Sequence, residues 1–258
     1  MKRTVLWLLA VILTVAATVL VFLPAAWLGQ VVEKQTGGRL TLGDAQGTLW
    51  RGSAFVGGAA GVGGAVTPLL PGRFAWRLSP LVLLGQVDLQ LENPLALAQP
   101  VALTGSWSDW RVSAGALLLP AEGLAGLGAP LNTLAPSGAM KLSWSSLDLA
   151  RLGNAIAVSG RTVLSMENMG SRVSNVKPLG SYEMVLDWRG ARVDLDLKTV
   201  RGALLLSGKG ALTDGRLNFS GQARAAEGYE ESLGSLLNLL GQRRMVDGKN
   251  IIALEFKQ

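Results

Sequence analysis

The chain has 258 residues and a formal net charge of +6, and it contains neither cysteine nor histidine. Their absence excludes disulfides, most zinc and haem sites, and every nucleophile that a histidine would activate. Thirty-three glycines beside only 16% charged residues favour a turn-rich β protein. The basic residues form no patch interleaved with aromatic residues, so we expect no nucleic-acid partner.

The N-terminal segment predicts a membrane anchor. An uncharged apolar run extends from Thr4 to Leu23, directly after Lys2 and Arg3, and stops at Pro24. About 20 apolar residues suffice for a helix to cross the hydrocarbon core. The basic flank favours a cytoplasmic N-terminus.

This run sets the expected topology. Residues 1–3 are assigned to the cytoplasm, 4–23 to a transmembrane helix, and 24–258 to the far side of the membrane. In a Gram-negative cell, this chain would therefore belong to the inner membrane with its bulk in the periplasm. A cleaved signal peptide is the open alternative, although its apolar core is usually only about 7 to 15 residues long.

Beyond the anchor, runs of alternating apolar and polar residues predict strands. The cleanest run is 191–200, in which Val193, Leu195 and Leu197 alternate with charged residues. Such period-two alternation, bounded by glycine, aspartate or proline, is typical of half-buried strands. Comparable runs occur at residues 40–42, 74–76, 81–91, 101–119, 139–149, 182–190, 203–212 and 216–225.

The spacing of these runs predicts a mainly β fold. They recur at roughly ten-residue intervals, and Asp214-Gly215 is a hairpin-turn signal, so we expect a curved antiparallel sheet or partial barrel. One C-terminal helix is expected at 230–240, where leucines recur on one face and Gly241 follows. The proline-bearing connector around residues 120–136 suggests two halves, 37–119 and 137–258.

Motifs that might carry chemistry have simpler interpretations. Ser174 and Lys177 have S-x-x-K spacing, but Pro178 opposes the helix that this motif needs. Asp194 and Asp196 fall on the polar face of a strand. We therefore expect no catalytic residue, no cofactor site and no metal site, and the chain is not expected to be an enzyme.

Tryptophan is unusually frequent, with eight residues against two tyrosines. Trp7 falls in the apolar run, and Trp27 is expected near its exit, where indole rings favour the membrane interface. The other six fall in or beside predicted strands. Core packing is the expected role, and a stacking surface for a ligand is the alternative.

Several stretches, in their order and spacing, resemble the type II secretion system protein N family, the GspN proteins. GTLWRG at 47–52 follows soon after the anchor, FAWRLSPLVLLG at 74–85 comes next, and LGSY stands at 179–182. The resemblance extends from residue 2 to 252. The residues that carry it are Gly47, Leu49, Trp50, Gly52, Trp76, Gly180 and Tyr182.

The resemblance implies an accessory inner-membrane subunit of the apparatus that exports folded proteins from the periplasm through an outer-membrane secretin. Its expected partners are the inner membrane and the other inner-membrane and periplasmic subunits of that system. No catalytic residues come with the family. The alternative is an AsmA-like periplasmic lipid-binding or lipid-transfer protein, whose curved sheet would offer an apolar trough open to lipid.

Overall fold

The structure, a computed structural model, describes residues 2–59, 61, 63–127, 131–153, 155–213, 215–246 and 249–257. Strands account for 57% of the chain, which confirms the mainly β prediction. The helices are α1 (Lys2–Val21), α2 (Ala26–Gln35), α3 (Leu131–Leu134) and α4 (Glu230–Leu240), with the 3-10 helices η1 (Pro80–Leu84) and η2 (Ala121–Leu127).

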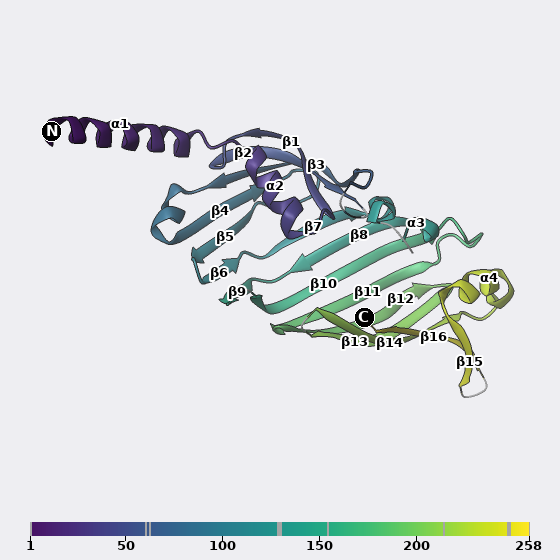
Figure 1. Cartoon of the computed structure of the whole chain (residues 1–258). Helices are drawn as coiled ribbons and strands as arrows, with labels where there is room; N and C mark the ends of the chain where they lie inside the picture. Colours follow the sequence, from purple (N-terminus) through teal and green to yellow (C-terminus); the bar gives the residue numbers. More distant parts are fainter. Residues whose placement is uncertain are drawn as a thin grey trace.

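Sixteen described strands form one antiparallel sheet, which is open rather than closed into a barrel (Figure 1). They are β1 (Leu40–Gly47), β2 (Arg51–Gly58), β3 (Thr67–Leu78), β4 (Gln86–Glu92), β5 (Val101–Ser106), β6 (Asp109–Val112), β7 (Gly115–Pro120), β8 (Pro136–Trp144), β9 (Leu147–Leu152), β10 (Ala155–Ser171), β11 (Gly180–Gly190), β12 (Arg192–Gly202), β13 (Leu204–Thr213), β14 (Arg216–Ala225), β15 (Gln242–Val246) and β16 (Lys249–Lys257).

Neighbouring strands mostly follow the chain order, and the long strand β10 is the main exception. Its first residues, 155–159, pair with β9, while residues 162–171 pair with β8 along the same side. The other side of β7 is hydrogen-bonded to the segment 96–98. One sheet therefore runs through both stretches that the sequence suggested as halves, and that division stays a prediction.

The sheet has an apolar and a polar face, because the pairing register aligns side chains of like character. Where β11 and β12 pair, Leu186 lies opposite Leu195, and Asp187 opposite Asp194. Continued across the sheet, the apolar row comprises Trp144, Thr162, Leu186, Leu195, Gly210 and Phe219. The alternation read from residues 191–200 thus predicted the face of each side chain correctly.

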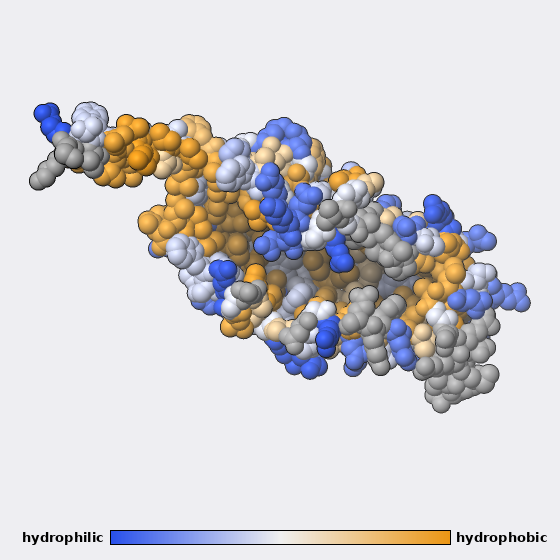
Figure 2. All heavy atoms as spheres, viewed as in Figure 1, coloured by the Kyte–Doolittle hydropathy of each residue, from blue (hydrophilic) through white to orange (hydrophobic). Residues whose placement is uncertain are grey.

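One α-helix packs against the apolar face at each of its two ends. Leu28 of α2 packs against Trp76 and its neighbours at one end. Leu233 and Leu236 of α4 pack against Leu204 and Ala223 at the other. Between them the sheet curves around a hollow in which hydrophobic atoms gather, with hydrophilic residues at its margins (Figure 2).

The predicted C-terminal helix is present. The helix expected at 230–240 is α4, with Leu233 and Leu236 buried. A further helix, α2, follows Pro24. The hairpin before α4 is also present, because Thr213 pairs with Arg216 and Gly215 has φ +77°. Asp214 lies outside the described residues.

The N-terminal run is helical, and the helix has the predicted length of 20 residues but lies two residues nearer the N-terminus. α1 includes Lys2 and Arg3 and ends at Val21, before Phe22 and Leu23. No helix among the described residues reaches the length and apolarity expected of a membrane span. The anchor prediction is therefore not confirmed.

The strand predictions need several corrections. Residues 81–84, the start of the run predicted at 81–91, belong to η1 rather than to a strand, because Pro80 starts a helical turn that Ser79 caps and Gly85 ends with φ +92°. β10 was not predicted, since Gly160, Arg161 and Thr162 interrupt its alternation. β15 and β16, which follow α4, were not predicted either.

Candidate interaction surface

Residues 47–52 join α1 to the sheet. They form the turn between β1 and β2, and the segment that follows α1 is hydrogen-bonded to this turn. Leu49 N donates to Leu23 O at 2.8 Å, and Ala25 N donates to Gly47 O at 3.1 Å. The indole Nε1 of Trp50 donates to Leu20 O at 2.8 Å, near the C-terminal end of α1.

The close packing of this turn explains its two glycines. Gly47 has φ +86°, and a side chain there would collide with the carbonyl oxygen of Arg51. A Cβ on Gly52 would lie 2.5 Å from the Trp76 ring and 2.7 Å from Gln46 O. Neither position has room for a larger residue.

Trp76 completes the junction from β3. Its side chain is buried against Ala25 and Ala54, and its Nε1 donates to Leu49 O at 3.0 Å. A buried indole that keeps its hydrogen bond fixes both the packing and the path of the turn. The structure therefore brings together the five N-terminal residues of the resemblance.

Gly180 and Tyr182 belong to a second cluster, beside α4. The Tyr182 hydroxyl donates to Leu204 O at 3.0 Å, and burial raises the pKa of this phenol well above its ordinary value. A Cβ on Gly180 would lie 2.8 Å from the same hydroxyl oxygen. The seven predicted residues thus form two packing clusters rather than one site.

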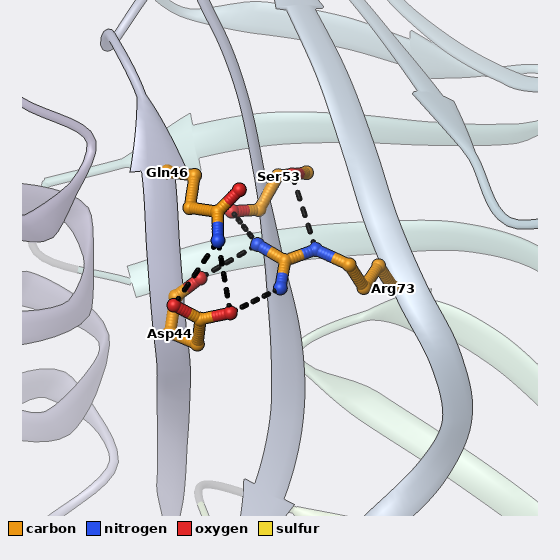
Figure 3. A network of polar contacts seen from close by, with 4 residues as sticks. All are labelled: Asp44, Gln46, Ser53 and Arg73. Atoms are coloured by element: carbon orange, nitrogen blue, oxygen red, sulfur yellow. Dashed lines mark hydrogen bonds and ion pairs between the residues drawn. The ribbon is translucent and has the colours of Figure 1, made fainter.

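A polar network fastens the irregular edge strand β1 to β2 and β3 (Figure 3). The Arg73 guanidinium contacts the Asp44 carboxylate, and its Nη2 donates to Asp44 O at 2.7 Å and to Ser53 O at 3.2 Å. Gln46 Nε2 donates to Asp44 Oδ2 at 3.0 Å. These donors lower the pKa of the Asp44 carboxyl, the Arg73 hydrogen bond most of all.

This network makes β1 a poor edge for a partner strand. Asp44 has φ +48°, and the register with β2 shifts between Gly43 and Gln46. Such a bulge, with α2 packed beside it, protects a sheet edge. At the opposite edge, β15 pairs only with β16 among the described strands, so its outer side remains available.

Ion pairs organise the polar face. Arg161 pairs with Asp187 at 2.6 Å, Arg192 with Asp194 at 2.8 Å, and Lys198 with Glu183 at 2.7 Å. The Arg161 hydrogen bond lowers the pKa of Asp187. The carboxylates of Asp194 and Asp196 pair with Arg192 and Lys209, and both lie on the polar face where the strand pattern placed them. Among described residues, no group of potential ligands is placed to hold a metal ion.

The remaining candidates have structural partners. The Ser174 hydroxyl is bonded to the backbone of Val176, not to Lys177. Trp144 Nε1 donates to Ser113 O and Trp188 Nε1 to Thr162 Oγ1, so both indoles are fixed within the sheet. Trp107 differs, because 58% of its surface is exposed.

A family model described as "Type II secretion system (T2SS), protein N" matches residues 38–251. The match covers both packing clusters and the strands β1 to β15, and it ends within β16 after residue 251. No curated protein and no solved structure matches the chain significantly.

Proposed function

The chain belongs to the type II secretion system protein N family, and we propose that it acts as an inner-membrane accessory subunit that binds other subunits and performs no catalysis. The family match, over most of the chain, carries this proposal. The paired carboxylates and bonded hydroxyl described above support a role in binding rather than chemistry.

We assign the membrane attachment to α1. The helix begins with the basic pair Lys2 and Arg3 and projects from the sheet (Figure 1). Its apolar side chains are exposed on all sides, including Trp7 at 71% and Leu13 at 73%. A helix that is apolar all round is suited to lipid rather than water.

For protein partners we assign the outer side of β15. An unpaired edge can accept a partner's strand through backbone hydrogen bonds. Val246 pairs with Lys249 and Met245 with Asn250. In a hairpin of this register the pair next to the turn, Val246 and Lys249, is the hydrogen-bonded one, so the backbone N–H of Met245 points away from β16. Met245→Pro should therefore abolish strand addition, whereas Met245→Ala should retain it.

Deletion of the gene tests the function as a whole. We expect exported enzymes to remain in the periplasm of the deletion strain, and wild type and Met245→Ala to restore their secretion. Met245→Pro should restore little secretion, and cross-linked membranes should yield fewer secretion subunits with it. Normal secretion in the deletion strain would contradict the proposal.

The AsmA-like alternative rests on the open hollow of the apolar face (Figure 2). Leu186 lies on this face, and Val185 on the opposite one. If the hollow holds lipid, purified wild type and Val185→Glu should carry bound phospholipid, and Leu186→Glu should carry much less. Equal lipid content in all three proteins would contradict this alternative. Altered outer-membrane permeability of the deletion strain, without a secretion defect, would favour it over the secretion role.

A further inference from the structure

One rim of the sheet collects the turns that lie on the same side as α1. The β1–β2 turn, η1 and the β5–β6, β9–β10, β11–β12 and β13–β14 turns all lie there. Adjacent turns are connected by backbone hydrogen bonds or by paired residues at the ends of their strands. The hydrogen bonds are Leu78 N to Trp50 O and Arg151 N to Ser108 O, and the paired residues are Gln86↔Ser106, Val158↔Gly190 and Arg192↔Thr213. We call this the α1-side rim.

Large apolar side chains are exposed along the part of this rim next to the junction. They form what we call the rim patch: Leu81 (48% exposed), Leu83 (48%), Leu84 (80%), Trp107 (58%) and Leu152 (63%). Isolated exposed leucines are common, but a group on consecutive turns marks an interaction surface. Hydrophobic atoms are visible at this end of the sheet, below α1, in Figure 2.

Backbone interactions hold the patch in this exposed arrangement. Ser79 caps η1 by accepting from Leu81 N, and Gly85 ends it. Trp107 Nε1 donates to Val82 O, so the polar group of the indole is already bonded within the protein. The ring can therefore enter an apolar medium without leaving an unpaired donor.

The same rim is basic. Arg51, Arg151 and Arg216 are exposed and form no ion pair with another described residue, while Arg189 and Arg192 share Asp194. Asp109 and Asp214 are the acidic residues in the sequence of these turns. Guanidinium groups in this position favour phosphate oxygens.

We propose that the α1-side rim rests on an anionic phospholipid bilayer, with the rim patch in the interfacial layer and the arginines on lipid phosphates. This inference rests on the proposed attachment through α1. Leucine and tryptophan favour the membrane interface, and nearby arginines add attraction to anionic lipids. The bonds from Trp50 and Leu49 to residues 20–23 keep the rim beside the membrane that holds α1.

Such contact would orient the whole sheet. Strands would extend away from the bilayer, and α4, at the opposite rim, would lie farthest from it. The outer side of β15 would then face the periplasm, where secretion subunits can reach it.

The absence of cysteine allows a direct test with the full chain. Single variants Leu84→Cys and Leu152→Cys, labelled with a nitroxide, are reconstituted in vesicles of phosphatidylethanolamine and phosphatidylglycerol. The matched control is Leu239→Cys, which is 64% exposed on α4. We expect the ratio of oxygen to nickel-chelate accessibility at 84 and 152 to exceed that at 239 by about threefold or more. A ratio at 84 equal to that at 239 would overturn the proposal and point to a protein partner for the patch.

The arginines are tested in the same vesicles. The double variant Arg151→Gln/Arg216→Gln should lower the ratio at residue 84 by about twofold, as should vesicles of phosphatidylcholine alone. Arg172→Gln, at the opposite rim, should leave it unchanged. No response to either treatment would overturn the assignment of an anionic bilayer.

A label at Leu13→Cys separates this inference from the anchoring on which it rests. A high ratio at residue 13 with a low ratio at 84 refutes only the rim contact. A low ratio at 13 refutes the attachment through α1 as well. High ratios at both positions support the two proposals together.

Discussion

Gly52 shows how a single residue sets the path of the chain between α1 and the sheet. Because glycine has no side chain, the Trp76 ring and the carbonyl oxygen of Gln46 can approach its Cα closely. The family motif therefore reflects backbone packing rather than reactivity. A residue of this kind is sensitive to the smallest added group.

Gly52→Ala is expected to destabilise the protein by about 1–3 kcal/mol, because the new methyl group overlaps the ring and two carbonyl oxygens. Gly43→Ala is the matched control on β1, since its Cβ would meet no atom within 4 Å. Urea unfolding followed by tryptophan fluorescence measures both. Equal stability of the two variants would contradict the packing assigned to the junction.

Tyr182 gives a pH-dependent prediction. Because burial raises the pKa of the folded phenol above its ordinary value of 10.0, ionisation above pH 10 favours the unfolded chain. Below that pH, Tyr182→Phe should cost about 1–2 kcal/mol through the lost bond to Leu204 O. The advantage of wild type should shrink as pH rises from 9 to about 11, in unfolding measurements on both proteins. An advantage that stays constant over this range would contradict the buried state of the phenol.

At the scale of elements, α4 acts as the cover for one end of the apolar face. Leu233 is fully buried against strands β13, β14 and β16, while Leu239 on the same helix is 64% exposed. Without this helix, the apolar residues of those strands would face water. The helix is therefore an integral part of the hydrophobic core.

Leu233→Ala should lower the free energy of unfolding by about 2–5 kcal/mol through the cavity it leaves. Leu239→Ala should change it by less than about 0.5 kcal/mol. Thermal unfolding measures the difference, and hydrogen exchange should show faster opening of α4 in the first variant alone. Similar effects for the two leucines would show that α4 does not pack as described.

At the scale of the molecule, the function depends on where the sheet is held. The junction ties residues 20–25 to the turn at 47–52, and this turn lies within the family match. If position is the contribution of α1, any membrane-spanning helix should substitute for it. A freed domain should not.

Replacing residues 1–23 with a cleavable signal peptide is therefore expected to reduce secretion strongly, because the freed domain is no longer concentrated beside the apparatus. Replacing them with an unrelated membrane-spanning helix should restore most secretion. Retention of exported enzymes in the periplasm measures both. Full activity of the freed domain would show that tethering is unnecessary.

The sequence by itself determined the local elements whose periodicity is regular. It predicted α4 from leucine spacing, the strand faces from the alternation at 191–200, and the family from motifs spread along the chain. These features depend on neighbours in sequence, so they are visible without a fold. The misassigned stretch at 81–84 shows the limit, because its leucines fit a strand until the helical turn between Pro80 and Gly85 is known.

Only the tertiary structure decided which of these residues lie together. It joined residues 20–25 to 47–52 and Trp76, separated Gly180 and Tyr182 from them, and placed η1, Trp107 and Leu152 on one rim. It also left the apolar face open between α2 and α4. The physical reason is that strand pairing and register bring together residues far apart in the chain, and no local pattern encodes those contacts.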